Sequence, residues 1–279
     1  MKPQKRVLVV DDDRALNSVL VELLRRADFT VASAADGAAA ARALEKEQFD
    51  IVVLDINLPK MTGLEVLQRL RTKASSPKVL VMTADETPST VLTAVKDQAY
   101  RYVSKPVKPM SIVEVVQQMA REEAPAPIEV ISATPEWVEL LIPCRAEMAD
   151  RLNSFLQTLN MHLPENIRDS VETAFRELLL NAIEWGGRFD ASRKVRIACI
   201  RSQRMLMYRI QDPGTGFQPH NLPHAAISNA PDAPYAHTKV RDEQNLRPGG
   251  FGLLMTRMLV DELIYNEAHN EVVFVKYLT

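Results

Sequence analysis

The chain has 279 residues, of which 46% are hydrophobic and 25% are charged, and its formal net charge at pH 7 is −2. These values are typical of a globular protein long enough for two domains, and they argue against intrinsic disorder. Nucleic-acid affinity rests largely on neutralising phosphates, so a slightly negative chain without runs of Lys and Arg disfavours direct DNA binding.

Neither a membrane segment nor a secretory signal is predicted. No run of eighteen apolar residues occurs, and the start, MKPQKRVLVVDDD, passes from a basic segment directly into acidic residues. We therefore expect a cytoplasmic protein. The two cysteines, Cys144 and Cys199, show no metal-ligand or disulfide spacing and are expected to fill apolar strand or core positions.

The first part of the chain alternates short apolar runs with helical patterns. Predicted strands are 6–10, 30–34, 51–54, 78–82 and 101–103, and predicted helices are 15–26, 37–47, 63–72, 89–97 and 111–121. The strands are continuously apolar, which indicates a parallel sheet covered by helices on both faces. Ligands of such sheets bind beyond the carboxyl ends of the strands.

Chemically active side chains follow four of these strands. They are Asp11 and Asp12, Asp55, Thr83 and Lys105. Three carboxylates at one edge would repel one another; a Mg²⁺ ion with oxygen ligands relieves this repulsion, and Lys105 adds a positive charge. Asp55 is then a candidate nucleophile toward a phosphoryl group, with Thr83 as a hydrogen-bond donor.

Four motifs within residues 1–123 resemble the receiver domain of two-component response regulators. They are VVDD at 9–12, LDINLPKMTG at 54–63, MTA at 82–84 and YVSKP at 102–106. The resemblance implies a flavodoxin-like, doubly wound, five-stranded parallel sheet. It also implies that Asp55 is the phosphoacceptor and that the upstream partner is a sensor histidine kinase.

The same resemblance assigns roles around Asp55. The implied Mg²⁺ ligands are Asp11, Asp12, Asp55 and the carbonyl of Asn57, with Asp11 acting through water. Thr83 and Tyr102 would form the switch pair, in which the hydroxyl moves to the phosphoryl group and the aromatic ring follows it inward, with Lys105 beside them. The Lys105–Pro106 peptide is expected to be cis.

A proline-containing segment separates the two halves of the chain. Pro125 and Pro127 in EEAPAPIEV cannot continue a helix, so residues 124–127 are predicted to be a short semi-rigid linker. The expected domains are therefore residues 1–123 and residues 128–279.

The second half has a different pattern of elements. Predicted elements are a strand at 137–142, helices at 145–159 and 164–185, a hairpin of strands at 194–201 and 204–211, a helix at 253–260, and strands at 261–265 and 271–277. Residues 217–248 lack clear periodicity and are longer than a usual connection, which indicates a lid or an insert.

Three polar motifs follow one another along this half. On the helix at 164–185, Glu177, Asn181 and Glu184 share one face, so a carboxylate and an amide could hold a divalent cation and take a proton. The hairpin ends in DPGTG, whose glycines allow close approach of a ligand and whose Asp212 can accept hydrogen bonds from an exocyclic amine. GGFG at 249–252 opens a helix whose free N–H groups can hold a phosphate.

This order of motifs resembles the GHKL, or Bergerat-type, ATP-binding fold across residues 128–279, and in particular the anti-sigma factor serine kinases. ELLLNAIE, DPGTGF, GGFGLLMTRMLVDELIYN and NEVVFVKYL carry the resemblance. It implies an α/β sandwich that binds ATP and Mg²⁺ and phosphorylates a serine of a STAS-domain antagonist.

Single residues of the second half gain roles from this resemblance. Glu177 would take the proton from the substrate serine, Asn181 would coordinate the Mg²⁺ of ATP, and Asp212 would bind adenine. The glycines with implied roles are Gly214 and Gly216 at the base and Gly250 and Gly252 at the phosphates. Arg241 and Arg247 are alternative contacts of the γ-phosphate.

Trp185 departs from the family pattern, because relatives usually carry His at this position. The favoured hypothesis is a response regulator in which phosphorylation of Asp55 controls an ATP-dependent serine kinase. The alternative, which Trp185 favours, is a nucleotide-gated module that sequesters a sigma factor or a STAS protein without catalysis. A receiver with a DNA-binding output is disfavoured, and homodimerisation is compatible with both resemblances.

The histidines do not indicate a conventional histidine kinase. No helix carries a phosphoacceptor histidine with its usual companions, and His162 is expected to be structural or exposed. The other histidines fall in loops without metal-ligand spacing, at His220, His224, His237 and His269.

Overall fold

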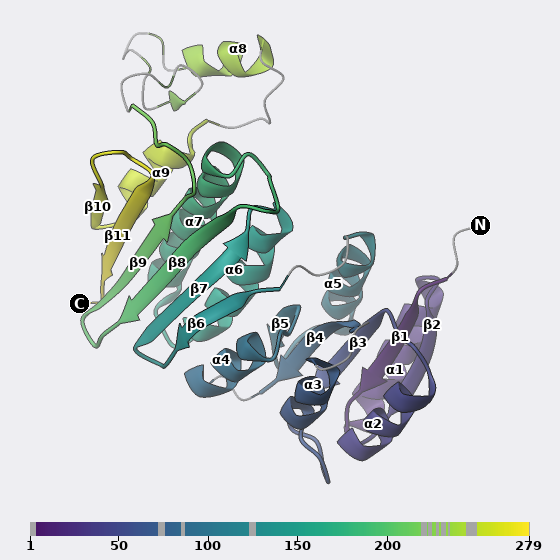
Figure 1. Ribbon diagram of the computed structural model, residues 1–279. Helices are drawn as coiled ribbons and strands as arrows, with labels where there is room; N and C mark the ends of the chain where they lie inside the picture. Colours follow the sequence, from purple (N-terminus) through teal and green to yellow (C-terminus); the bar gives the residue numbers. More distant parts are fainter. Residues whose placement is uncertain are drawn as a thin grey trace. The chain divides into compact units, whose positions relative to one another are not determined.

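The computed structural model describes residues 4–71, 76–84, 87–122, 127–218, 222, 225–226, 229, 233, 235–243 and 250–278. The chain divides into two compact units, Met1–Pro127 and Ile128–Thr279. Each unit has its own sheet and helices, which Figure 1 colours from purple to blue in the first unit and from teal to yellow in the second.

The first unit is built on a five-stranded parallel sheet in the order β2-β1-β3-β4-β5. Its strands are β1 (Arg6–Val10), β2 (Thr30–Ala34), β3 (Ile51–Asp55), β4 (Lys78–Thr83) and β5 (Arg101–Ser104). Its helices are α1 (Arg14–Arg26), α2 (Gly37–Lys46), α3 (Gly63–Arg71), α4 (Pro88–Lys96) and α5 (Pro109–Arg121). The predicted doubly wound fold is therefore confirmed.

The strand order explains where a site forms in this unit. The chain places β2 on one side of β1 and β3 on the other, so the connections that leave β1 and β3 diverge and open a crevice at their carboxyl ends. Helix α1 packs with α5, and α3 packs with both α2 and α4. The buried, continuously apolar strands between them hold this edge rigid.

The second unit is built on a six-stranded antiparallel sheet in the order β10-β11-β9-β8-β7-β6. Its strands are β6 (Glu129–Ala133), β7 (Trp137–Pro143), β8 (Lys194–Arg201), β9 (Met205–Gln211), β10 (Glu262–Tyr265) and β11 (Glu271–Tyr277). Its α-helices are α6 (Glu147–Leu159), α7 (Glu165–Asn181), α8 (Ala236–Glu243) and α9 (Gly252–Leu259). Helices α6, α7 and α9 lie together on one face of the sheet (Figure 1), which is the predicted α/β sandwich.

Aromatic packing fixes how α7 sits on this sheet. The Tyr208 ring on β9 stacks on Phe274 of β11 with centroids 4.9 Å apart, and Phe175 of α7 tilts onto Tyr208 at 5.5 Å. All three side chains are almost completely buried. Because the apolar stripe of α7 faces the sheet, the polar residues Glu177 and Asn181 are left half-buried at its edge.

Three local features differ from the prediction. The helix predicted to run to Trp185 is α-helical only to Asn181, and a π-helical turn, η1 (Ala182–Gly186), follows it, with the N–H of Gly187 bonded to the carbonyl of Ala182 at 2.8 Å. A single π turn, with its wider i→i+5 hydrogen bond, is too short to break the apolar spacing of the α-helix before it, so the sequence pattern does not distinguish it.

The other two differences are additional elements. The edge strand β6 was not predicted, because it is short, only partly buried and irregularly paired with β7 between Val130 and Ser132. Helix α8 lies within the segment at 217–248 that lacks clear periodicity. The helix has only eight residues and few of them are apolar, so it gives no helical periodicity in the sequence.

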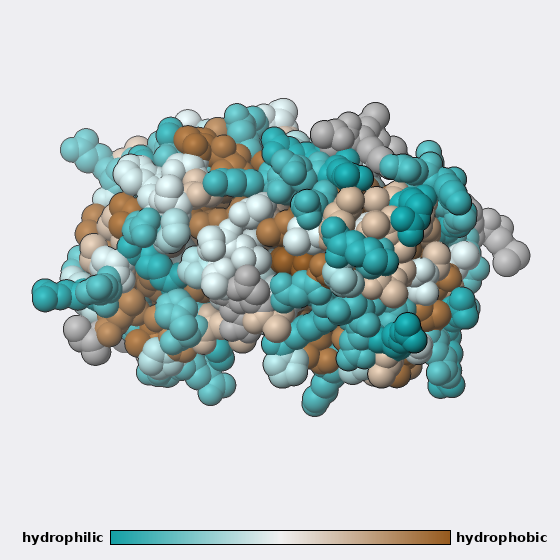
Figure 2. Space-filling view, turned by 90° about the horizontal axis from the view of Figure 1, so that it is seen from below, coloured by the Kyte–Doolittle hydropathy of each residue, from teal (hydrophilic) through white to brown (hydrophobic). Residues whose placement is uncertain are grey.

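The surface is mixed in polarity. On the face shown in Figure 2, hydrophilic residues separate the hydrophobic patches from one another. Among the described residues, no helix combines the length and the hydropathy that a membrane crossing requires.

Candidate functional sites

An acidic cluster lies at the carboxyl ends of β1 and β3. Ligand atoms of Asp11, Asp12 and Asp55 all lie within 4.8 Å of one another. Asp11 and Asp55 are buried and Asp12 is exposed, so the cluster is open on one side. Carboxylate oxygens at this spacing are the ligands that Mg²⁺ prefers.

Lys105, which follows β5, joins two of these carboxylates. Its Nζ donates to Asp11 Oδ2 at 2.7 Å and to Asp55 Oδ2 at 2.6 Å. Burial opposes the charge on Lys105, but these hydrogen bonds outweigh it and raise the pKa of the ammonium group. Burial raises the pKa of Asp11, although the bonds from Lys105 and from the Asp13 N–H partly offset it.

Thr83 reaches the acidic cluster through Asn57. The Asn57 N–H donates to Asp55 Oδ1 at 3.0 Å, and the Asn57 side-chain amide donates to Thr83 Oγ1 at 3.4 Å. Thr83 is fully buried and Tyr102, on the neighbouring strand, is 2% exposed, so the ring occupies an interior position. The Lys105–Pro106 peptide is cis, as predicted.

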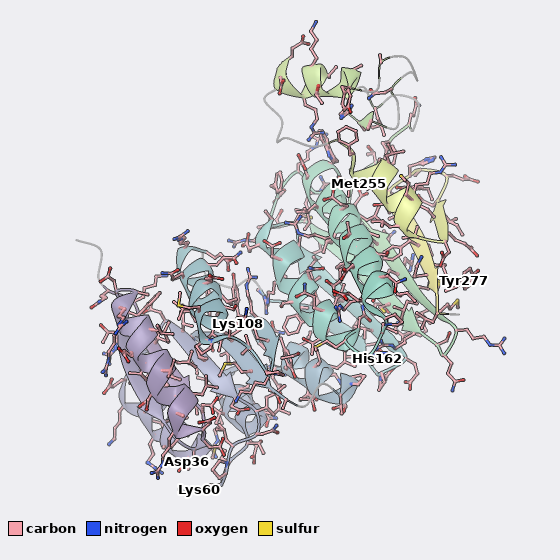
Figure 3. The ribbon with its side chains drawn as sticks, turned by 180° about the vertical axis from the view of Figure 1, so that it is seen from behind. Asp36, Lys60, Lys108, His162, Met255 and Tyr277 are labelled. Carbon is pink, nitrogen blue, oxygen red and sulfur yellow. The ribbon has the colours of Figure 1, made fainter. Side chains whose placement is uncertain are left out.

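The loop that carries Asn57 is held at both ends. The Gly63 N–H bonds to the Ile56 carbonyl at 2.9 Å, and Lys60 forms an ion pair with Asp36 at 2.5 Å; Figure 3 labels both charged residues. These contacts fix the path of the backbone after β3. The Asn57 amide is thereby kept next to Asp55.

Asp13 follows the acidic cluster, and the sequence alone assigns no role to it. Its carboxylate caps α1 by accepting from the N–H groups of Ala15 and Leu16 at 2.9 and 3.2 Å. Asp is a preferred residue at this helix position. Asp13 therefore orients the helix that follows the acidic cluster.

The second unit contains a cavity of about 550 Å³ beside α7, β9 and the start of α9. Seven predicted ATP-site residues line it: Glu177, Asn181, Asp212, Gly214, Gly216, Gly250 and Gly252. This volume falls within the range of small-molecule sites. Sequence reasoning thus placed seven residues from three segments of the chain around one cavity.

Asp212 is anchored at the end of β9. Its Oδ1 accepts from the Gly214 N–H at 2.7 Å, and a side chain at Gly186 would collide with the Asp212 carboxylate. Burial raises the pKa of Asp212, and the Gly214 N–H and the charge of Arg193 only partly offset this effect. Among the described residues, no donor is bonded to Oδ2, which is therefore available to a ligand.

Glu177 lies against the start of α9. A Cβ at Gly252 would overlap Glu177 Oε2, so in its present position the carboxylate lies directly against the N-terminus of α9. Within the described part of the chain, the carboxylate of Glu177 forms no hydrogen bond or ion pair with another side chain. A carboxylate in this position can take a proton beside a phosphate held by the helix N–H groups.

Two of the glycines adopt left-handed backbone conformations. Gly216 has φ of 85° and packs so closely on the Ala268 carbonyl that a Cβ would overlap it, and Gly250 has φ of 98°. Other residues adopt this region only at a cost in free energy. These positions shape the two turns that border the cavity.

Sequence reasoning missed an aromatic group in the cavity wall. The rings of Phe217, Tyr265 and His269 lie with their centroids 5.3 to 5.6 Å apart, and all three residues line the cavity. Burial raises the pKa of Tyr265 to about 12, so its hydroxyl stays neutral. Only Phe217, which follows DPGTG directly, carried a local signal.

Trp185 and Arg241 also line the cavity. Trp185 is 41% exposed and forms part of the wall without closing the space, whereas Arg241 is buried. Arg247, the other arginine predicted to contact the γ-phosphate, lies outside the described residues, as does Gly249 of GGFG.

The first unit thus carries an acidic cluster and the second unit a cavity, and comparisons with known proteins assign each unit to a family. The model of the response regulator receiver domain family matches residues 7–134, and that of the histidine kinase-like ATPase domain family matches residues 142–276. The chain belongs to the response regulators, and it joins a receiver domain to a histidine kinase-like ATPase domain.

Several known proteins are similar to this chain. The DNA-binding response regulator MtrA of Mycolicibacterium paratuberculosis is 30% identical over 211 residues, which cover 75% of this chain and 91% of MtrA. The alkaline phosphatase synthesis transcriptional regulatory protein PhoP of Bacillus subtilis is 33% identical over 124 residues, or 44% of this chain and 52% of PhoP. A receiver domain structure from Methanospirillum hungatei is 28% identical, with a TM-score of 0.40, and covers 42% of this chain and 93% of that one.

Proposed function

We propose that phosphorylation of Asp55 controls an ATP-dependent protein serine kinase of the anti-sigma factor type, which acts on a STAS-domain protein. The observation that carries this proposal is the cavity of the second unit, in which Glu177 and Asn181 face the same space as Asp212 and the glycine turn of α9. Such a kinase needs a general base, a metal ligand and an acid that recognises adenine. It also needs a phosphate cradle, that is, a glycine-rich helix start whose N–H groups hold the phosphates.

The receiver half of the proposal starts from the acidic cluster. Of the three carboxylates, Asp11 and Asp55 share the ammonium group of Lys105, so a net negative charge remains that a divalent cation fits. Asp11, Asp12 and Asp55 would hold Mg²⁺, together with the Asn57 carbonyl, and the metal would neutralise phosphoryl oxygens during transfer.

Phosphotransfer would then use the carboxylate of Asp55. One of its oxygens attacks the phosphorus of a phosphohistidine on a sensor kinase, the P–N bond breaks, and the histidine leaves with a proton. Lys105 Nζ, already 2.6 Å from Asp55, would bind the phosphoryl oxygens, and Thr83 would turn its hydroxyl toward them. Tyr102 already occupies an interior position and would be held there once Thr83 has turned, which makes these residues the switch.

The kinase half would bind ATP in the second cavity. Asp212 would accept from the exocyclic amine of adenine, with Gly214 and Gly216 leaving room for the base. Gly250 and Gly252 would hold the phosphates at the start of α9, and Asn181 would hold the Mg²⁺ that accompanies them.

Catalysis in this scheme depends on Glu177. Its carboxylate would take the proton of a substrate serine, whose oxygen attacks the terminal phosphorus while ADP leaves. The contact between Glu177 and Gly252 supports this role, because it sets the carboxylate beside the proposed phosphate cradle.

The alternative function is a nucleotide-gated module that binds a sigma factor or a STAS protein without catalysis. Trp185 favours it, since relatives of the kinase type usually carry His there. The open cavity beside Trp185 supports ATP binding in either case. Phosphorylation of a STAS partner on serine would distinguish the kinase from the non-catalytic binding module.

A phosphotransfer assay tests the proposal. Purified protein is incubated with labelled ATP, Mg²⁺ and the STAS-domain protein of the same cell, and label on serine is measured. Glu177→Gln is expected to abolish transfer while ATP binding persists. Glu184→Gln is the control, because it removes a carboxylate from the turn that follows α7, outside the cavity lining. Transfer that survives Glu177→Gln would remove that residue from its role.

Three further properties belong to the proposal. We place the domain boundaries at residues 1–123 and 128–279, and the division into compact units after Pro127 supports them. We propose a cytoplasmic protein that contacts no membrane, can form a homodimer and binds no DNA directly. The match of residues 142–276 to an ATPase domain supports an output other than DNA binding, and a mobility-shift assay at low salt tests it.

A further inference from the structure

The floor of the cavity near Asp212 is a row of side chains across three strands. Ile210 of β9 pairs with Val272 of β11, and Val272 pairs with Tyr265 of β10; all three residues line the cavity. Asp212 lies two residues after Ile210, so its side chain is directed to the same face of the sheet. Its carboxylate lies close to Gly186, in the turn that follows α7. A planar ligand held by Asp212 therefore lies over this floor.

Two further aromatic rings surround the Tyr265 end of the floor. His269 stacks on Tyr265 with centroids 5.5 Å apart and an interplanar angle of 27°, and Phe217 stands edge-on to Tyr265 at 5.6 Å with an angle of 82°. We call these three residues the aromatic wall. All of them are half-buried and line the cavity, so the wall presents aromatic surface to a ligand.

Hydrogen bonds join the aromatic wall to the turn that carries Asp212. The Asp212 N–H donates to the Asn270 carbonyl at 2.9 Å, and the Asn270 side chain donates to the Gly214 carbonyl at 3.1 Å. Asn270 directly follows His269 in the chain. The wall thus belongs to the Asp212 end of the cavity and not to the phosphate cradle at the start of α9.

Asp212 alone would not distinguish adenine from cytosine. Both bases carry an exocyclic amine that a carboxylate can accept from, whereas guanine has a carbonyl oxygen at the corresponding position. The floor supplies a second criterion, because neighbouring strands lie about 4.8 Å apart and the row from Ile210 to Tyr265 therefore spans about 10 Å. The two fused rings of a purine cover more of this length than the single ring of a pyrimidine.

We propose that the aromatic wall of Phe217, Tyr265 and His269 is a stacking surface for the nucleobase and makes this site selective for purine over pyrimidine nucleotides. This inference rests on the proposed ATP site. With the exocyclic amine bound to Asp212, the fused rings of adenine extend along the floor to the wall, whereas the single ring of cytosine ends before it. Stacking on aromatic side chains then favours adenine.

Calorimetry of the full chain with Mg²⁺ tests this inference, with non-hydrolysable analogues of ATP and CTP as the two ligands. Tyr265→Leu keeps apolar bulk on β10 but removes a ring. His269→Asn removes a ring at a position with φ of 57°, which Asn tolerates. Each variant is expected to weaken binding of the ATP analogue about tenfold and to leave binding of the CTP analogue within about twofold.

Tyr277→Leu is the matched control. Tyr277 ends the neighbouring strand β11, is labelled in Figure 3 and is not among the described residues that line the cavity. The same substitution there should leave both affinities within about twofold of the wild type. Circular dichroism checks the fold of all three variants.

Two results would overturn the inference alone. One is a ratio of ATP-analogue to CTP-analogue affinity that stays unchanged in both wall variants, which would assign only a packing role to the rings. The other is a wild type that binds the two analogues equally well. Wild-type protein that binds neither analogue would overturn the proposed function, and this inference with it.

Discussion

The packing of Gly186 against Asp212 predicts a sharp effect of one added methyl group. A Cβ at Gly186 would overlap the Cβ, Cγ and Oδ1 of Asp212. The carboxylate cannot move aside freely, because Oδ1 is bonded to the Gly214 N–H at 2.7 Å. We therefore expect Gly186→Ala to rotate Asp212 out of its position at the end of β9.

The magnitude follows from the hydrogen bond that is lost. A bond to a charged acceptor contributes about 1.5–3 kcal/mol, and every 1.4 kcal/mol is a tenfold change in affinity. If Asp212 anchors adenine, Gly186→Ala should weaken ATP binding about tenfold to a hundredfold, as measured by calorimetry.

Gly187→Ala is the matched control for Gly186→Ala. Its Cβ would meet Cys144 instead of Asp212, and neither Gly187 nor Cys144 lines the cavity. This variant should lower the Tm of the second unit and leave ATP affinity within about twofold. Equal ATP affinity in wild type and Gly186→Ala would refute the assignment of Asp212 as the base anchor.

Three other substitutions test the remaining parts of the account. Lys105→Ala leaves Asp11 and Asp55 without their shared ammonium, so unfolding free energy should fall by about 1–3 kcal/mol and Mg²⁺ should raise the Tm more than it does in wild type; equal Mg²⁺ shifts would contradict the account. Asn181→Ala should weaken ATP binding in Mg²⁺ but not in EDTA, and equal losses under both conditions would exclude a metal-ligand role. The hydrogen bonds from Arg209 lower the pKa of Glu271 below its ordinary value of 4.5, so this pair stabilises the folded state above pH 4.5 and the stabilisation is lost as pH falls through the lower, folded-state pKa. Arg209→Ala should therefore cost about 0.5 kcal/mol at pH 7 and progressively less in acid, as urea unfolding can show; a pH-independent difference would count against the ion pair.

The receiver site could be predicted almost completely from the sequence. Each active residue follows a continuously apolar strand, and parallel strands bring their carboxyl ends to one edge, so Asp11, Asp55, Thr83 and Lys105 converge by topology alone. The sequence pattern did not predict the local hydrogen bonds around this site. The cap formed by Asp13 and the link from Asn57 to Thr83 depend on backbone turns that leave no period in the sequence.

The sequence predicted the glycines and the polar residues of the ATP-type cavity, but it did not predict the aromatic residues that line it. Tyr265 ends β10 and His269 lies in the turn between β10 and β11, and both reach the cavity only because β11 pairs with β9 in the sheet. The burial of His237 depends in the same way on the packing of α8 against Phe251. Long-range contacts of this kind have no signature in a single sequence.

The central claim is that phosphorylation of Asp55 controls serine kinase activity, and one rate comparison tests it directly. The initial rate of label transfer from ATP to serine of the STAS partner is measured with and without a small-molecule phosphodonor, in wild type and in Asp55→Asn. The account predicts that the phosphodonor changes the wild-type rate and leaves the rate of Asp55→Asn unchanged. A wild-type rate that is the same with and without the phosphodonor would contradict it.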